Sequence, residues 1–332
     1  MNNILKSVNI CTIGGGTGSS VLLRGLKNCS DFLTAIVTVS DDGGSSGILR
    51  KELGVLPPGD FRNCVAALSD SESIIKELFD YRFDQGKSLK GHSLGNLLIA
   101  AMSDITGNFE EGLYQSAKIL GAKGTVLPSS LEDIVLQAKL TDGSLVNGES
   151  LIPLKEGKIA SVHLNPASAK GSVSTINALK KADLIIIGPG SLYTSVIPPL
   201  LVQDLINVIK ESSALKIYIC NVATQKGETD GYSVYDHIVA IEEHTYKDIF
   251  DYIIADENYN IPIQDGYLIE NIYDAEEVIS RVESDFHTKD FVIKAQIHAG
   301  GRGKGGGVKY SSDHTSALEN CKKILGMNLI TH

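Results

Sequence analysis

A β-branched run that breaks into a glycine- and hydroxyl-rich loop constrains the fold of this chain more than any other feature. Residues 36–39, Ile-Val-Thr-Val, have the composition of a buried strand. They lead into residues 40–47, where glycines allow a ligand to approach the backbone and where carboxylates and hydroxyls gather. Because ligands of open α/β sheets bind at the carboxyl ends of the strands, this segment predicts a binding edge.

The same succession of short apolar run, polar loop and helix recurs along the chain. The other runs and their loops are 8–13 with 14–18, 183–187 with 188–195, and 216–220 with 221–232. Short strands separated by helices are typical of a parallel, doubly wound sheet, so we predict a Rossmann-like α/β fold. Parallel strands all end on one side of their sheet, so we expect these loops to share one edge.

Residues 124–162 interrupt this alternation with strand-like runs. Asp-Gly at 142–143 and Gly-Lys at 157–158 stand between apolar runs and are hairpin signals. We therefore predict a β-rich insertion on the α/β core. We place the α/β domain at residues 1–288 and an atypical segment at 289–332, which has seven basic and three acidic side chains (7 − 3 = +4).

The composition excludes several classes of protein. A net charge of −10 argues against a nonspecific nucleic-acid binder, whose surface is basic. No apolar run approaches the roughly 20 residues that cross a bilayer, and the first residues do not resemble a signal peptide. Five scattered cysteines without CxxC spacing predict neither a disulfide framework nor a zinc site. We therefore expect a cytoplasmic protein with no nucleic-acid partner and no membrane insertion.

The glycine loop at 14–18 follows a predicted strand and precedes a predicted helix at 19–26. Free backbone N–H groups and the positive end of a helix dipole favour a phosphate at such a place. The spacing is neither G-x-G-x-x-G nor a Walker sequence, because no Lys-Ser/Thr follows. An anion site and a tight connection therefore both stay open for Gly14, Gly15, Gly16, Thr17 and Gly18.

A second group of polar residues follows the strand at 36–39. Asp41 and Asp42 stand at its end, and Mg²⁺ is typically held by one or two carboxylates together with substrate phosphates. A Pro-Pro-Gly turn then precedes a helix with Asp60 as its predicted N-cap and with Arg62 and Asn63 in its first turn. We predict a phosphorylated ligand here, with Mg²⁺ as the candidate metal and no cofactor certain. A surface loop before a capped helix is the alternative.

Six motifs carry a resemblance to a known family. They are GGGTGSSVLLRGLK (14–27), IVTVSDDGGSSGILRKEL (36–53), PPGDFRNCVAALSD (57–70), GHSLGNLLIAAM (91–102), GPGSLYTSVIPPLL (188–201) and NVATQKGETDGY (221–232). Over roughly residues 8–255 the chain resembles the gluconeogenesis-factor (YvcK-like) family, relatives of the CofD phospholactate transferases. The resemblance implies a regulator that binds UDP-N-acetylglucosamine or a related nucleotide. It also implies a role in growth on gluconeogenic carbon and in cell shape. The implied partners are a second copy of the chain, in a homodimer, or cell-wall or metabolic proteins.

The resemblance also implies roles for individual residues. Loop N–H groups would bind phosphates, Arg62 would supply charge, and Tyr193 would offer an aromatic face to the ligand. His92 and Asn96 match a family motif as an orienting residue and a ligand-facing amide. The predicted ligand residues beyond those already named are Gly43, Gly44, Ser45, His92, Asn96, Gly188, Gly190, Ser191, Tyr193, Asn221, Thr224 and Gln225.

The relationship to CofD leaves an enzymatic alternative open. In it, Asp41 and Asp42 would hold Mg²⁺ for transfer of a 2-phospho-L-lactate group from a nucleotide diphosphate to a deazaflavin precursor, and Arg62 would help to neutralise the leaving group. We name no catalytic residue, because no His, Cys or Ser stands out as a nucleophile. The motifs at 188–201 and 221–232 favour the regulator.

A third alternative is a stable scaffold that binds its ligand weakly, because the last segment departs from the family pattern. Residues from about 290 to 332 resemble a fragment of the β subunit of succinyl-CoA ligase, an ATP-grasp enzyme. The similarity includes HAGGRGKGGGVK (298–309) and LGMNLITH (325–332). The other parts of an ATP-grasp site are missing, so we do not expect this segment to bind ATP by itself.

Overall fold

The computed structural model describes residues 5–70, 73–256, 269, 271–286, 289, 291–294 and 308–325. The chain divides into two compact units, residues 1–263 and 264–332. The division predicted at 288–289 therefore falls inside the second unit. The two motifs of the predicted ATP-grasp similarity, 298–309 and 325–332, lie outside the described residues except at 308, 309 and 325.

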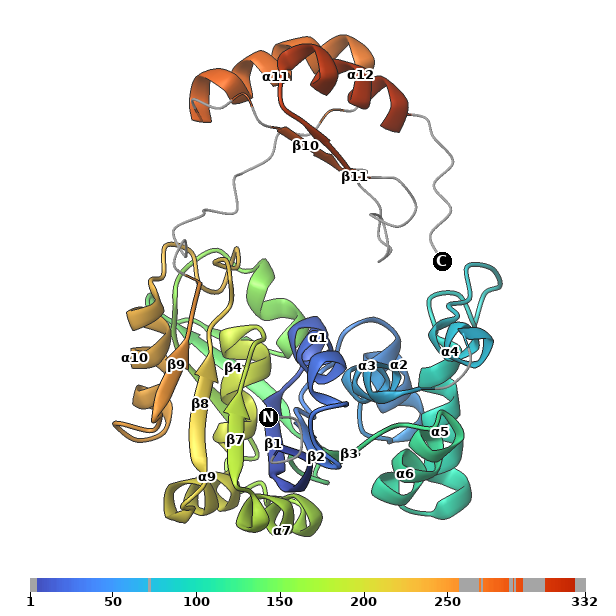
Figure 1. Ribbon diagram of the computed structural model, residues 1–332, viewed down its shortest axis with the longest axis vertical. Coiled ribbons are helices and arrows are strands. Elements are labelled where there is room, and N and C mark those ends of the chain that lie inside the picture. The colour runs from blue at the N-terminus through green and yellow to red at the C-terminus, as the bar shows by residue number, and fades with distance from the viewer. Residues whose placement is uncertain are drawn as a thin grey trace. The chain divides into compact units, whose positions relative to one another are not determined.

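The first unit is built on a six-stranded sheet in the order β3-β2-β1-β7-β8-β9, in which all neighbours are parallel (Figure 1). The strands are β1 (Asn9–Gly14), β2 (Phe32–Val37), β3 (Thr125–Pro128), β7 (Leu184–Ile187), β8 (Leu215–Ile219) and β9 (Tyr252–Ile254). Strand order reverses between β1 and β7, and ligands of such sheets bind outside the carboxyl ends at this switch point. The predicted doubly wound fold is confirmed.

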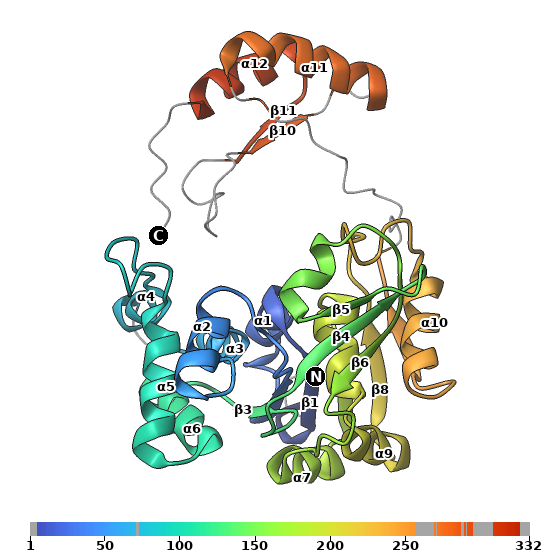
Figure 2. The same cartoon turned by 180° about the vertical axis from the view of Figure 1, so that it is seen from behind.

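Helices cover this sheet. They are α1 (Gly16–Leu26), α2 (Gly44–Leu53), α3 (Gly59–Leu68), α4 (Ser73–Asp80), α5 (Leu94–Thr106), α6 (Phe109–Ile119), α7 (Val173–Lys181), α8 (Ile197–Leu200), α9 (Gln203–Glu211) and α10 (Val234–His244). Shorter turns are η1 (Leu5–Ser7), η2 (Glu149–Leu154) and the π-helical η3 (Leu192–Val196). Figures 1 and 2 show α5 and α6 beyond the β3 edge and α10 beside β9 at the opposite edge.

The core lies around the central strands. β1 is buried along almost its whole length, because helices pack on both faces of a parallel sheet, and this explains its continuous apolar sequence. Phe61 of α3 is fully buried and meets the ring of Phe109 edge-on at 5.0 Å between centroids. This contact joins α3 to α6 and so fixes the helix that follows the Pro-Pro-Gly turn.

The insertion forms a separate antiparallel sheet in the order β5-β4-β6. Its strands are β4 (Val135–Leu140), β5 (Leu145–Asn147) and β6 (Ile159–Asn165), and Figure 2 shows them in front of the parallel sheet. The hairpin predicted at 142–143 is confirmed, since Lys139 pairs with Leu145 across it. The predicted start of the insertion at 124 is wrong: β3 pairs in parallel with β2, because the helices from α2 to α6 form a crossover that returns the chain to the main sheet.

The second unit contains α11 (Ile272–Phe286), β10 (Phe291–Lys294), β11 (Val308–Ser311) and α12 (His314–Ile324). The two strands are antiparallel neighbours. Its hydrophobic cluster contains the buried residues Ala275, Ile279, Phe291, Ala317 and Cys321. Helix α11 thus packs with the segment after residue 288. The boundary between the two units therefore lies before this helix.

No single helix among the described residues has the length and hydropathy of a membrane span. One pair, Leu192–Leu200 and Gln203–Glu211, reaches that length and hydropathy together but is bent by 74°.

Candidate functional site

The loops after β1 and β7 are in backbone contact at the switch point. The Gly188 N–H donates to Ile13 O at 2.9 Å. A Cβ placed on Gly18 would lie only 2.7 Å from Pro189 O, so glycine is needed for this close approach. The two loops therefore meet as predicted, at the place where the topology expects a ligand.

Helix α1 begins earlier than predicted, at Gly16, so that Gly16, Thr17 and Gly18 form its first turn. Gly16 has a φ of +67°, which favours glycine. Gly15 occupies the N-cap position, and no side chain caps the helix there. The Gly16 N–H donates to the Asp60 carboxylate at 2.8 Å. By helix geometry, the N–H groups of Thr17 and Gly18 have no partner within the helix and remain available to an anion.

Asp60 does not cap α3, and that prediction is wrong. The helix begins at Gly59 with Pro58 in the N-cap position and without a side-chain cap. The carboxylate of Asp60 instead crosses to the start of α1, where a Cβ on Gly15 would lie 2.4 Å from its Oδ2 atom. Burial, and to a smaller extent the nearby charge of Asp41, raises the pKa of Asp60 to about 6.

The start of α2 resembles the start of α1. Gly43 occupies its N-cap position without a side-chain cap, and Gly44 is exposed with a φ of +44°. The Gly43 N–H donates to Asp41 Oδ1 at 2.9 Å. Burial raises the pKa of Asp41, although this hydrogen bond and one from Ser46 lower it. Two helix N-termini without side-chain caps therefore lie beside two carboxylates.

Glu149, which is not among the predicted site residues, joins this acidic group. Its carboxylate accepts a hydrogen bond from the Ser40 hydroxyl at 2.6 Å, and the Ser150 N–H donates to Asp42 Oδ1 at 2.8 Å. Burial raises the pKa of Glu149 well above its usual range, and Asp41 raises it further. The insertion is thus anchored on the loop after β2. No local sequence signal marks Glu149, because only the tertiary contact distinguishes it from other acidic residues.

The acidic group fits a divalent cation by charge, because a cation would offset the buried negative charge and the mutual repulsion that together raise these pKa values. Among the described residues, no three His, Cys, Asp or Glu side chains are arranged to hold one metal ion. Asp42 contacts the insertion, so Asp41 and Asp60 are the pair that faces the helix starts. Mg²⁺ accepts one or two carboxylates and completes its coordination with phosphate oxygens and water. These residues therefore fit a metal that binds together with a phosphorylated ligand.

Arg62 is turned toward other groups of the protein. Its Nη1 atom lies 3.1 Å from Asp80 Oδ1, and its Nη2 atom donates to Asn63 Oδ1 at 2.6 Å. Its Nε atom is buried and has no partner among the described residues. A direct contact of Arg62 with phosphate remains a prediction, and it would compete with the ion pair to Asp80.

Ser45, His92 and Asn96 form one buried cluster. The Asn96 Nδ2 group donates to Ser45 Oγ at 3.1 Å, and this oxygen lies 2.9 Å from His92 Nδ1. The Asn96 Oδ1 atom is buried without a partner in the described part of the chain. The cluster joins the start of α2 to the start of α5, which agrees with an orienting role for His92 and leaves Asn96 one unused acceptor.

Several residues predicted to contact the ligand from the loops after β7 and β8 make contacts within the protein. Asn221 clamps Gly190: its Oδ1 atom accepts from the Gly190 N–H at 3.0 Å, and its Nδ2 group donates to Gly190 O at 2.8 Å. Tyr193 is buried, with its hydroxyl 2.8 Å from that of Tyr232. The Gln225 Nε2 group donates to Glu228 at 3.2 Å. The remaining predicted ligand residues of these loops, Ser191 and Thr224, are partly exposed.

Glu228 occupies the helix start that follows β7, where a phosphate was predicted. Its carboxylate accepts from the Tyr193 N–H at 3.2 Å and from the Thr194 hydroxyl at 3.0 Å. Burial raises the pKa of Glu228, although these bonds lower it. The sequence carries only a weak signal for this role: Glu228 is an acidic residue inside the motif at 221–232, directly before Thr-Asp-Gly. The starts of α1 and α2 therefore stay the predicted places for phosphate.

Glu228→Ala is expected to lower the free energy of unfolding by about 2–4 kcal/mol, because the Tyr193 N–H and the Thr194 hydroxyl would be buried without an acceptor. Glu228→Gln is expected to cost less than about 1 kcal/mol, since an amide oxygen still accepts and burial already disfavours the charge. Urea unfolding followed by circular dichroism measures both. Equal losses for the two variants would contradict this role.

Two cavities lie away from these loops. One of about 480 Å³ lies beside α6 and β3, and one of about 370 Å³ lies beside β6 and α10. Neither is lined by residues of the loops after β1, β2, β7 or β8. The candidate site is therefore defined by backbone donors and carboxylates at the carboxyl edge of the sheet.

Comparison with known proteins identifies the relatives of this chain. The model of the family described as 2-phospho-L-lactate transferase CofD matches residues 10–294. A protein named gluconeogenesis factor from Halalkalibacterium halodurans is 52% identical over 261 residues, which are 79% of this chain and 80% of that protein. The gluconeogenesis factor of Bacillus subtilis is 50% identical over 246 residues, 74% of this chain and 78% of the relative.

Two further comparisons, one of sequence and one of structure, agree with these relatives. A relative from Nostoc sp. is 56% identical over 239 residues, and the match covers 72% of this chain and about half, 52%, of that longer protein. A crystal structure of a UPF0052 family member from Bacillus halodurans has a TM-score of 0.73 and 49% identity, covering 82% of this chain and 85% of the other. These comparisons give no support to the resemblance between the last segment and the ATP-grasp ligase.

Proposed function

Because this chain belongs to the CofD family and is similar to its gluconeogenesis factors, we propose that it is a regulator that binds a nucleotide sugar, UDP-N-acetylglucosamine, at the strand-end loops. We place its role in the cytoplasm, in growth on gluconeogenic carbon and in cell shape, as a homodimer or with cell-wall or metabolic proteins. Two relatives named gluconeogenesis factor, each about 50% identical to this chain, support the regulator over an enzyme.

The observation that carries this proposal is the pair of helix N-termini without side-chain caps beside Asp41 and Asp60. The N–H groups of Thr17 and Gly18 would bind one phosphate of the ligand, and those at the start of α2 would bind the other. Asp41 and Asp60 would hold Mg²⁺, which neutralises phosphate charge when it is bound. The buried acceptor of Asn96 lies on the α5 side of the same region.

Isothermal titration calorimetry of the full chain tests this function. We expect UDP-N-acetylglucosamine to bind with a dissociation constant on the order of 10 μM or tighter in the presence of MgCl₂. Asp31→Asn, which alters an exposed carboxylate paired with Lys6, should bind as the unchanged chain does. Absence of heat with this ligand, at protein concentrations that would detect millimolar affinity, would exclude the nucleotide-sugar regulator.

A second candidate function is 2-phospho-L-lactate transfer to a deazaflavin precursor. The family match over residues 10–294 and the facing carboxylates Asp41 and Asp60 favour it. In this function the same helix starts would hold the diphosphate, and the chain would not discriminate in favour of a UDP sugar. Binding of GDP with MgCl₂ but not of UDP-N-acetylglucosamine, together with product formation detected by mass spectrometry, would select the transferase. Binding of neither ligand would select the scaffold.

A further inference from the structure

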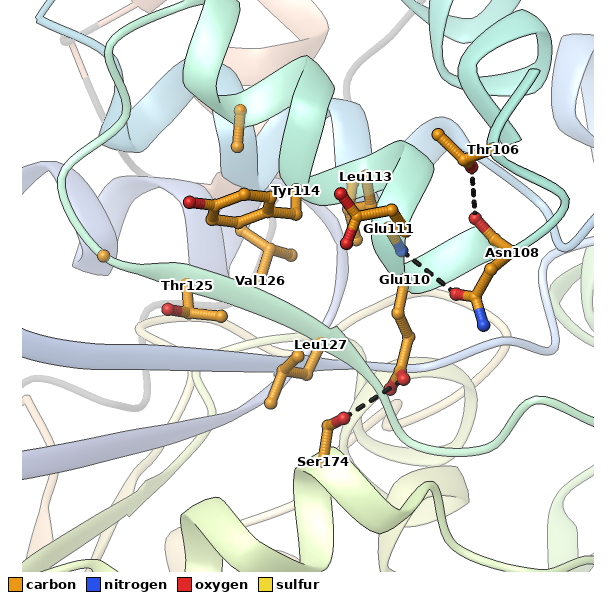
Figure 3. A pocket seen from close by; sticks show the side chains of 12 residues that line it. Thr106, Asn108, Glu110, Glu111, Leu113, Tyr114, Thr125, Val126, Leu127 and Ser174 are labelled. Atoms are coloured by element: carbon orange, nitrogen blue, oxygen red, sulfur yellow. Dashed lines mark hydrogen bonds between the residues drawn. The ribbon is translucent and has the colours of Figure 1, made fainter. Parts of the chain in front are cut away.

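The larger cavity, of about 480 Å³, lies between α6, the edge strand β3 and the start of α7 (Figure 3). Its lining shares no residue with the strand-end loops. The lining includes Glu110, Glu111, Leu113, Tyr114, Val126 and Ser174. The volume suffices for a small organic molecule.

Glu110 gives this cavity an unused acceptor. One carboxylate oxygen, Oε2, accepts a hydrogen bond from the Ser174 hydroxyl at 3.1 Å, and Figure 3 shows the side chain reaching toward this residue. The other oxygen, Oε1, is buried and has no hydrogen-bond partner among the described residues. A buried carboxylate oxygen without a donor is costly, so a hydrogen-bond donor placed against it would be stabilising.

The charge of the lining is one-sided. Glu110 and Glu111 both contribute carboxylates, and among the described residues no Lys, Arg or His lines the cavity. Glu111 has a neutral partner, since the Gln115 Nε2 group donates to its Oε1 atom at 2.7 Å. We propose that this cavity binds a small organic cation, with a guanidinium or ammonium group on a short alkyl chain, through the Glu110 carboxylate.

The other walls match such a ligand. Leu113 and Val126 are buried and present an apolar floor that an alkyl chain would cover. The ring of Tyr114, 56% exposed, stands over the cavity in Figure 3 and offers a face to a cation. An N–H group of the cation would donate to Glu110 Oε1, while Ser174 continues to hold the other oxygen.

The probe is n-butylguanidinium, with n-butylurea as its uncharged control of similar shape. Two-dimensional nuclear magnetic resonance of the full chain follows the backbone amides of Tyr114 and Thr125. At low ionic strength we expect saturable shifts with a dissociation constant on the order of 1 mM for the cation, and at least tenfold weaker binding of the urea. Glu110→Gln should weaken cation binding at least fivefold, whereas Glu211→Gln on α9 should leave it unchanged.

Tyr114→Leu provides a second variant, which leaves the buried carboxylate unchanged. It should weaken binding of the cation twofold to fivefold. Equal binding of n-butylguanidinium and n-butylurea would overturn the proposal. So would an unchanged affinity in both Glu110→Gln and Tyr114→Leu, or shifts that avoid α6 and β3. The loops after β1, β2, β7 and β8 contribute no residue to this cavity. The result therefore does not depend on whether UDP-N-acetylglucosamine binds.

Discussion

Asp60→Asn is expected to stabilise the chain by about 2–3 kcal/mol at pH 7.5 while weakening its binding of a phosphorylated ligand with Mg²⁺. The pKa of Asp60 is raised in the folded state from 3.8 to about 6 by burial and by Asp41. The folded chain therefore holds this proton more tightly than the unfolded chain. An amide at this position keeps an acceptor for the Gly16 N–H but carries no charge.

The sign of the pH dependence follows from this shift. The contribution of Asp60 to stability is fully present below about pH 4, is lost as the pH rises toward about 6, and stays lost above that value. Urea unfolding at pH 5 and pH 7.5 should therefore show a smaller stability difference for Asp60→Asn than for the unchanged chain. Asp41 and Glu149 also have raised pKa values, so part of the dependence should remain.

The control is Asp31→Asn, because Asp31 is mostly exposed and pairs with Lys6 at the surface. It should change stability by less than about 0.5 kcal/mol at either pH. MgCl₂ should stabilise the unchanged chain at pH 7.5 more than Asp60→Asn, because a cation would offset the buried negative charge. If Asp60→Asn is less stable than the unchanged chain at pH 7.5, the hydrogen bond from the Gly16 N–H to the charged carboxylate contributes more to stability than burial of that charge costs.

Gly18→Ala is expected to destabilise the chain by about 1–3 kcal/mol, whereas Gly25→Ala in the same helix is expected to stabilise it by roughly 0.5–1 kcal/mol. A Cβ on Gly18 would lie 2.7 Å from Pro189 O and 2.9 Å from Pro189 C, both backbone atoms that cannot rotate away. A Cβ on Gly25 would meet nothing within 4 Å. The two substitutions therefore separate helix propensity from the contact between the loops.

Thermal and urea unfolding of the two variants measure this difference directly. Gly18→Ala should also weaken the binding of UDP-N-acetylglucosamine, because relief of the contact would move the first turn of α1 away from the loop after β7. Gly25→Ala should bind as the unchanged chain does. Equal stability of the two variants would mean that the loops separate at little cost, and the close approach of α1 to Pro189 would then have no structural importance.

Local patterns were sufficient where a residue's neighbours in sequence decide its role. The alternation of apolar runs, glycine loops and helices predicted the parallel sheet, because both faces of its strands are buried and their sequences are therefore continuously apolar. The Asp-Gly hairpin was predicted for a similar reason, since turn geometry depends on adjacent residues. The meeting of the loops after β1 and β7 followed from the topology alone.

Local patterns failed where partners are distant in sequence. Asp60 has the chemistry of a helix cap, yet it bonds to Gly16, which is 44 residues earlier. Strand β3 follows helices and precedes a hairpin, and only its pairing with β2 assigns it to the main sheet. Asn221 and Tyr193 have side chains suited to a ligand, but contacts with Gly190 and Tyr232 engage them inside the protein.

The sequence by itself determined the fold class and the edge at which the loops meet. Only the tertiary structure decided which polar groups contact one another: it brought Glu149 to the loop after β2, placed Glu228 at the helix start after β7 and left Glu110 with an unused oxygen. The physical reason is that periodicity and turn preferences act between neighbours in sequence, whereas burial and charge act between neighbours in space.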